Sequence, residues 1–136
     1  ENYGTTFISG ACCKALKGLP ISIRQNVYFD YLYIDDFCRI VKCFVDKEPK
    51  YHTYNVTSGT KVDLKSLAAF VKKVSGSDVP VIVCRDGLAN EYTADNSRMR
   101  SELGDFRLTS AVDGINHLYD YYREIRNDID LMKLLY

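Results

Sequence analysis

Long apolar runs are missing from this sequence of 136 residues. None approaches the roughly 18 residues that a membrane-spanning helix needs. A signal-peptide pattern is missing too, and the first residue is Glu1 rather than Met, so we expect a piece of a longer protein. A net charge of either sign is also absent, because 18 Lys and Arg balance 18 Asp and Glu. We therefore expect no membrane and no nucleic acid among its partners.

The five cysteines include no C-x-x-C pair, and their odd number gives no disulfide framework. Cys12 and Cys38 lie in apolar helical patterns, and Cys84 ends an apolar strand pattern. We expect reduced, buried and unreactive thiols in a cytoplasmic protein. A zinc site would need clustered Cys or His, and His52 and His117 lie far from any such cluster, so no metal is expected.

Most motifs that carry chemistry are absent as well. The sequence has no glycine-rich G-x-G-x-x-G loop and no P-loop, so it encodes no cradle for the phosphates of a cofactor. No Tyr is followed four residues later by Lys, and there is no serine nucleophile elbow or metal-binding His pair. We therefore assign no catalytic, cofactor-binding or metal-binding residue.

The most informative feature that is present is the segment Asp30–Phe37. It begins as an aromatic-rich run with β-propensity and ends in two adjacent acids, Asp35 and Asp36. Apolar residues then recur at helical spacing from Phe37 to Val45. The change of period predicts a strand followed by a helix, with Asp35 or Asp36 as the helix cap.

The rest of the chain alternates between helical and strand patterns. Helices are predicted over residues 5–17, 37–47, 64–75 and 95–103 and in a long stretch after Ser110; strands are predicted over 21–24, 27–34, 51–56 and 79–84. Asp63 and Ser110 are predicted to cap the helices that follow them, and Gly76 to end the helix over 64–75. Residues 85–93 are predicted to be a polar loop. About four strands and five helices indicate one α/β domain over residues 1–136, with α+β character as an isolated piece. Residues 127–136 are predicted to extend the last helix or to contact another subunit.

Three segments, taken in order, resemble the C-terminal part of the extended short-chain dehydrogenase/reductase family, the NAD-dependent epimerases and dehydratases of nucleotide sugars. The first is Asp30–Phe37, similar to the family's Arg-Asp-aromatic-apolar-Tyr/His-Val-x-Asp stretch. The second is Tyr54–Gly59 with the helix behind it. The third runs from Arg85–Gly87 through Tyr92–Arg98 to Glu102–Gly104, similar to the family's Arg-x-Gly-Asp loop and the short helix after it. The order and spacing of all three are more specific than any one segment.

The resemblance implies the C-terminal, substrate-binding part of a Rossmann-type enzyme, and it covers residues from about Phe7 to Tyr122. In such enzymes the dinucleotide domain, which binds NAD or NADP, and the catalytic Tyr-x-x-x-Lys lie upstream. The missing motifs are those that a C-terminal piece should lack. The partners implied are a nucleotide sugar, the missing dinucleotide domain and, as an open alternative, a second subunit in a homodimer.

The resemblance also implies binding residues. Arg85 matches the family's loop arginine, which grips the substrate diphosphate, as suits a forked guanidinium. Tyr92 matches a position near the sugar or phosphate. Phe29 replaces an arginine that is usually a second phosphate contact, and we expect Arg24, on a neighbouring strand, to compensate. The family's loop acid is also missing, with Leu88 in its place.

The leading function is therefore that of the substrate-binding portion of an NAD(P)-dependent epimerase, dehydratase or reductase acting on a nucleotide-activated sugar. One alternative is a non-catalytic relative that binds a ligand or partner, which Phe29 and Leu88 keep open. Another is an independent binding module with the chain complete as it stands. The sequence leaves open which sugar and nucleotide are bound and which reaction occurs. It also leaves open whether the cofactor is NAD or NADP.

Overall fold

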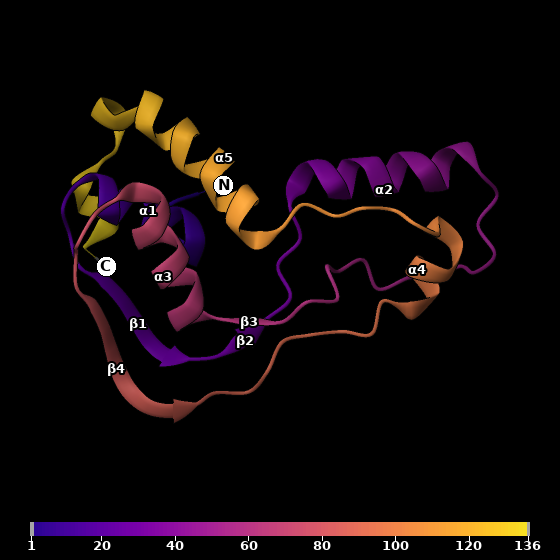
Figure 1. Ribbon diagram of the computed structural model, residues 1–136, viewed down its shortest axis with the longest axis horizontal. Coiled ribbons are helices and arrows are strands. Elements are labelled where there is room, and N and C mark those ends of the chain that lie inside the picture. The colour runs from indigo at the N-terminus through magenta and orange to yellow at the C-terminus, as the bar shows by residue number, and fades with distance from the viewer. Residues whose placement is uncertain (1, 136) are drawn as a thin grey trace.

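The computed structural model describes residues 2–135. Its elements are, in chain order, α1 (Phe7–Leu16), β1 (Ile21–Asn26), β2 (Tyr28–Phe29), α2 (Ile34–Asp46), β3 (Val62–Asp63), α3 (Leu64–Ser75), β4 (Val81–Leu88), α4 (Ser97–Leu103), α5 (Ala111–Glu124) and the 3₁₀ turns η1 (Arg126–Asp128) and η2 (Leu131–Leu134) (Figure 1). Within these residues the protein has four strands and five α-helices, which confirms the predicted α/β class.

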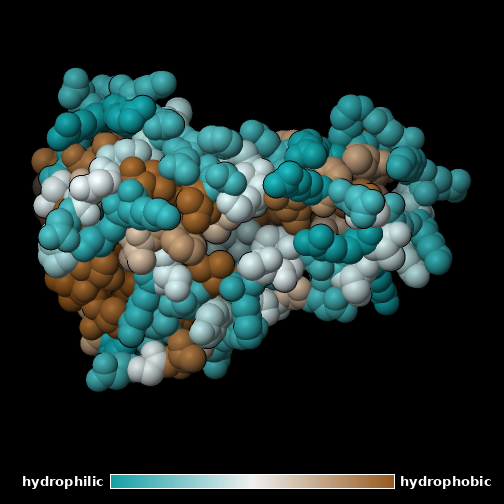
Figure 2. Space-filling view, viewed as in Figure 1, coloured by the Kyte–Doolittle hydropathy of each residue, from teal (hydrophilic) through white to brown (hydrophobic). Residues whose placement is uncertain are grey.

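The main core lies between a pair of parallel strands and three helices. β1 pairs with β4, with Ile21 opposite Val81. Ile21 and Ile23 are buried while Ser22 and Arg24 are exposed, as the alternation in β1 predicts. α1 and α3 both contact β1, and α5 packs on those two helices (Figure 1). The other edge of β4 is not covered by any of these helices, and apolar residues gather at the surface there (Figure 2).

The ends of α3 and α5 follow from local chemistry. The carboxylate of Asp63 accepts hydrogen bonds from the N–H groups of Lys65 (3.1 Å) and Ser66 (3.2 Å), so it caps α3 as predicted. Gly76 ends α3 with φ of 62°, a left-handed conformation in which a side chain would be strained. Ser110 caps α5, again as predicted.

A smaller lobe contains α2 and α4, which lie at the end of the molecule away from α1 and α3 (Figure 1). Ile40 of α2 is fully buried and Met99 of α4 is 2% exposed. The ring of Phe44 packs on that of Tyr54 with centroids 4.5 Å apart. The lobe thus has its own small set of apolar contacts.

The prediction that Asp35 or Asp36 caps α2 is wrong. α2 begins at Ile34, so both acids lie within its first turn. Asp36 is buried and accepts hydrogen bonds from the N–H of Thr109 (2.6 Å) and from Nη1 of Arg39 (2.9 Å). It ties α2 to the segment that leads into α5, while its charge still lies near the positive end of the helix.

Two predicted strands differ from the structure. Of residues 27–34, only Tyr28–Phe29 form a strand, which pairs with β3, and Ile34 already belongs to α2. Residues 51–56 form no strand. Among the described residues no strand pairs with them; Asn55 instead donates from its side chain to the backbone oxygen of Asp95 (2.9 Å), which supplies no ladder of backbone hydrogen bonds.

The segment after α5 does not continue that helix. α5 ends at Glu124 and two 3₁₀ turns follow. Ile129 and Leu134 of this segment are buried in the main core, so the chain folds back onto the domain. Residue 136 lies outside the described residues, and contact of 127–136 with another subunit stays a prediction.

The cysteines are free, but not all are buried. Cys12 and Cys13 are buried, and burial raises the pKa of Cys13 to about 12, which makes it unreactive. Cys38 and Cys84 are exposed, contrary to the prediction, because the apolar side of α2 and the outer face of β4 have no covering element. No helix in residues 2–135 is long and apolar enough to cross a membrane.

Candidate functional site

Three of the four predicted binding residues lie around one cleft. The cleft has a volume of about 580 Å³ and is lined by Arg24, Phe29 and Arg85 together with the start of α1. We call it the arginine cleft; its lining residues are Thr5, Thr6, Phe7, Arg24, Gln25, Val27, Phe29, Tyr31, Leu64, Arg85 and Ala89. Its size falls in the range of small-molecule sites.

The pairing of β1 with β4 brings the two arginines to this cleft. Gln25 lies opposite Arg85, so Arg24 is one residue out of register with Arg85 on the adjacent strand, and the alternation of strand side chains directs the two arginines to opposite faces of the pair; both line the cleft at the strand ends. The register shifts after Gln25, and the Gln25 side chain donates a hydrogen bond to the backbone oxygen of Asp86 (3.2 Å), which holds the two strand ends together. Arg85 therefore lies in β4, which runs to Leu88, and not in the predicted polar loop.

An aromatic wall forms one side of the cleft. The rings of Phe29 and Tyr92 stack with centroids 5.3 Å apart and an angle of 11° between their planes. Tyr31 packs against Phe29 from another direction, with ring centroids 5.2 Å apart. The N–H of Tyr92 donates to the backbone oxygen of Tyr28 (2.9 Å), so the backbone also ties the two segments together. Tyr92, 63% exposed, backs Phe29 and does not line the cleft itself.

The loop after Tyr92 is fixed by a second contact with the same segment. The N–H of Ala94 donates to the carboxylate of Asp30 (3.0 Å). Asp30 therefore acts as an acceptor that holds residues 92–94 beside β2. This role follows from no local sequence pattern, since Asp30 and Ala94 are distant in the chain.

The charges of the cleft favour an anionic ligand. Neither Arg24 nor Arg85 takes part in an ion pair with any described carboxylate. No acidic side chain lines the cleft; Thr5 and Thr6 line it as well, and their hydroxyl groups donate to the backbone oxygen of Asn2 (3.3 and 3.0 Å). Two guanidinium groups and an aromatic wall can bind a ligand that combines phosphate with a flat ring.

Groups for metal binding are not brought together in the described part of the chain. No group of three or more His, Cys, Asp or Glu side chains converges there as a metal site. The pKa of Tyr33 is raised by burial and by the neighbouring carboxylate of Asp35, so this tyrosine is less acidic than usual. The arrangement can bind and orient a ligand.

Sequence reasoning found the arginines and Phe29 but missed other lining residues. Thr5, Thr6 and Gln25 lie on the cleft and were not among the predicted site residues. Thr5 and Thr6 directly precede α1, and polar residues just before a helix are a signal that could have identified them. Tyr31 lines the cleft too and was not among the predicted site residues either.

Several solved enzyme structures share this fold. The chain superposes on UDP-glucuronic acid 4-epimerase from Bacillus cereus, solved with UDP-glucuronic acid and NAD, with a TM-score of 0.76, 19% identity and coverage of 89% of this chain and 40% of that one. For UDP-glucose 4-epimerase from Thermotoga maritima, solved with UDP-glucose, the TM-score is 0.73, with 20% identity and coverage of 88% and 40%. For the enzyme WbmF from Bordetella bronchiseptica, solved with NADH, the values are 0.75, 18%, 94% and 39%.

No protein-family model and no curated protein sequence matches this chain. The structural similarity shows that the chain has the fold of the C-terminal part of Rossmann-type, NAD-dependent epimerases of the extended short-chain dehydrogenase/reductase kind. The resemblance inferred from the sequence is thus confirmed for the fold. The chain spans about 40% of the length of these structures.

Proposed function

We propose that this chain is the substrate-binding portion of an NAD(P)-dependent epimerase, dehydratase or reductase that acts on a nucleotide-activated sugar. One observation carries the proposal: Arg24 and Arg85 come from adjacent strands to one acid-free cleft with an aromatic wall. In this proposal both guanidinium groups bind the diphosphate of the ligand, where paired donors meet two phosphate oxygens at once. Structures of the same fold contain UDP-sugars, which supports this ligand class.

Phe29 and Arg24 have linked roles in this proposal. Phe29 has no charge with which to bind phosphate, and it supplies a flat apolar surface instead. Arg24 lies on the same cleft and provides the second positive charge beside Arg85. The ligand is thus held by charge at the ends of β1 and β4 and by ring contact at β2.

The residues of this chain do not fit a dinucleotide cofactor, because the sequence has no glycine-rich phosphate loop. The chemistry of the enzyme class is transient hydride transfer at a sugar carbon, for which NAD or NADP is the hydride carrier. We assign the cofactor and the general acid and base to a separate dinucleotide-binding domain. This chain binds and orients the nucleotide end of the substrate.

We propose that the dinucleotide-binding domain docks on α2. Ile34, Phe37, Val41 and Val45 recur along one side of the helix and are 62%, 43%, 41% and 78% exposed. An apolar stripe of this kind is normally covered in a folded enzyme. Residues 51–56, with a strand-like sequence and no strand partner, provide a second contact for the same domain.

The free cysteines support a reducing compartment, and we propose the cytoplasm. A homodimer remains part of the proposal for the whole enzyme.

Calorimetric titration with UDP-glucose and UDP-glucuronic acid tests the proposed function. We expect binding to the 136-residue chain, and we expect Arg85→Gln to weaken it by about tenfold or more, since hydrogen bonds to charged groups contribute about 1.5–3 kcal/mol. Arg123→Gln, which removes an exposed arginine on α5, is the matched control and should leave affinity unchanged. Absence of heat with both nucleotide sugars would contradict the proposal.

The second candidate is a non-catalytic relative that binds a ligand or partner without turnover. The observation that favours it is Phe29, which puts a ring where the resemblance leads one to expect an arginine. The two candidates differ in the protein to which α2 docks. A dinucleotide domain with a glycine fingerprint and Tyr-x-x-x-Lys supports the enzyme, and a partner that lacks both supports the non-catalytic relative.

A further inference from the structure

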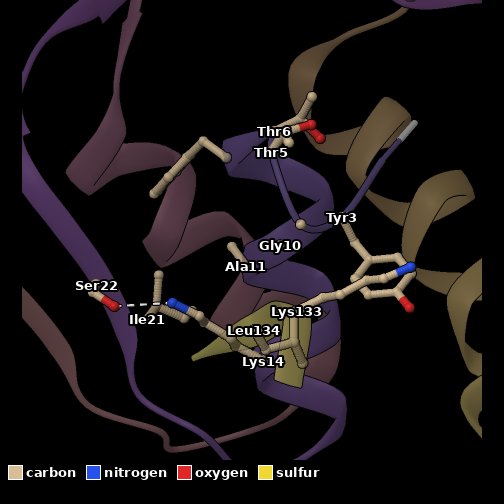
Figure 3. A pocket seen from close by; sticks show the side chains of 12 residues that line it. Tyr3, Thr5, Thr6, Gly10, Ala11, Lys14, Ile21, Ser22, Lys133 and Leu134 are labelled. Atoms are coloured by element: carbon tan, nitrogen blue, oxygen red, sulfur yellow. Dashed lines mark hydrogen bonds between the residues drawn. The ribbon is translucent and has the colours of Figure 1, made fainter. Parts of the chain in front are cut away.

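A second cavity lies beside the arginine cleft, on the other side of the start of α1. It has a volume of about 230 Å³ and runs along α1 between β1 and η2 (Figure 3). We call it the lysine pocket, because Lys14 and Lys133 line it together with Thr5, Thr6, Ser22 and Tyr3. Gly10 forms part of its wall (Figure 3).

The positive charge of this pocket is not neutralised by any described carboxylate. The chain is neutral as a whole, yet residues 2–29 contain basic residues and no Asp or Glu. That stretch builds most of the pocket, and no acidic side chain lines it. Neither Lys14 nor Lys133 belongs to an ion pair among the residues that the structure describes.

The two ammonium groups lie toward opposite walls of the pocket. Nζ of Lys14 donates a hydrogen bond to the hydroxyl of Ser22 on β1 (2.9 Å). Nζ of Lys133 lies over the ring of Tyr3, 6.0 Å from its centroid. Figure 3 shows Lys14 reaching toward β1 and Lys133 toward Tyr3. Their partners are uncharged, so each ammonium group retains donors and charge for an anion in the pocket.

We propose that the lysine pocket is a second anion-binding subsite, which takes a phosphate or carboxylate group. The ammonium groups would supply charge-assisted hydrogen bonds, and the Ser22 hydroxyl would supply a further polar contact. The volume of the pocket suits a small anionic group rather than a whole nucleotide. The proposal does not depend on the identity of the ligand in the arginine cleft.

The positions of the two cavities give the subsite a use. Thr5, Thr6 and Phe7 line both, so the cavities are neighbours along the acid-free stretch. A ligand that places its diphosphate in the arginine cleft can place a further anionic group in the lysine pocket. If the proposed function is correct, the lysine pocket selects nucleotide sugars with an additional acidic group.

Titration of the ¹⁵N-labelled 136-residue chain with sodium phosphate, followed by amide NMR at constant ionic strength, tests the subsite. Sodium acetate forms a second arm, which separates carboxylate binding from phosphate binding. We expect saturable shifts of the amide signals of Gly10, Ser22 and Leu134 with at least one of the two anions. Lys14→Gln and Lys133→Gln should each weaken that binding by about tenfold, the effect of losing one charged hydrogen bond.

Matched variants separate charge from structure. Lys14→Arg keeps the charge and should retain binding. Lys72→Gln removes a lysine of α3 that pairs with Asp78 away from the pocket, so it should change nothing. If Lys14→Gln fails to give a folded spectrum, the subsite is tested with Lys133→Gln, because Lys133 is exposed. Shifts that neither lysine variant alters would overturn the subsite, as would no saturable shift with either anion. Shifts confined to Arg24 and Arg85 would overturn it too, while leaving the arginine cleft intact.

Discussion

Phe29 and Tyr92 stack face to face, with ring centroids 5.3 Å apart and planes inclined by 11°. Phe29 also forms a β-bridge with Tyr92, so the two residues are held by the backbone as well as by their rings. This contact joins β2 to the segment between β4 and α4. It fixes one wall of the arginine cleft at a position where the resemblance leads one to expect a charge.

We expect the Phe29–Tyr92 stack to be energetically coupled. A double-mutant cycle with Phe29→Ala and Tyr92→Ala should give a coupling energy of about 0.5–1.5 kcal/mol in urea unfolding, as for other aromatic pairs. The pair Phe29→Ala and Tyr121→Ala is the control, because Tyr121 lies on α5 and packs on Tyr122 instead. Equal coupling in both cycles would show that the stack contributes nothing specific.

Asp36 should matter more to stability than any surface acid. Asp36→Ala leaves the Thr109 N–H without its 2.6 Å acceptor and removes the ion pair to Arg39. We expect the free energy of unfolding to fall by about 2 kcal/mol, the cost of losing hydrogen bonds to a buried charged group. Asp120→Asn breaks an exposed pair with Arg123 and should cost less than about 0.5 kcal/mol. Similar losses in the two variants would contradict the assigned role of Asp36.

The Asp63 cap predicts a dependence on pH. Although burial raises its pKa, hydrogen bonds from Ser66, Asn26 and Lys65 outweigh this and lower the pKa below its usual range. The charged cap therefore contributes its full stability above the unfolded pKa of about 3.9, and this contribution is lost as the pH falls through the lower folded value. Urea unfolding of wild type and Asp63→Asn should show a gap at neutral pH that closes below about pH 4. A difference in unfolding free energy between wild type and Asp63→Asn that grows as the pH falls would contradict the lowered pKa of Asp63.

Two glycines within helices should respond in opposite ways to alanine. In α1, a Cβ at Gly10 would lie 2.9 Å from the backbone oxygen of Tyr3, which crosses the helix there. Gly10→Ala should destabilise the fold despite the higher helix propensity of alanine. In α5, a Cβ at Gly114 would meet Tyr33 at 3.4 Å, an ordinary contact. Gly114→Ala should stabilise the fold by up to about 1 kcal/mol in thermal unfolding. A Gly10→Ala variant that is more stable than wild type would contradict the close approach of the Tyr3 backbone oxygen to Gly10.

Features with a local cause could be predicted from the sequence. Asp63, Gly76 and Ser110 begin or end helices through bonds within a few residues, and these positions are confirmed. The alternation of β1 is also local, because each side chain points to the face opposite its neighbour. Asp36 shows the limit, since its role comes from Thr109, which no local pattern brings near.

Features that depend on a distant partner could not be predicted reliably. Residues 51–56 have a strand sequence, but a strand needs a neighbour and none of the described segments provides one. β4 continues through Arg85 because β1 pairs with it there. Three residues of the arginine cleft, Arg24, Phe29 and Arg85, were predicted from the sequence, while their place around one cleft required the parallel pairing of two strands that are far apart in sequence.

Amide NMR of the 136-residue chain during titration with UDP-glucose tests the central claim most directly, because it locates the ligand. The proposal predicts saturable shifts for Arg24, Phe29, Arg85 and Ala89, which line the arginine cleft. Shifts restricted to the separate polar cavity of Thr53, Asn55 and Arg98, or no shifts at all, would contradict it.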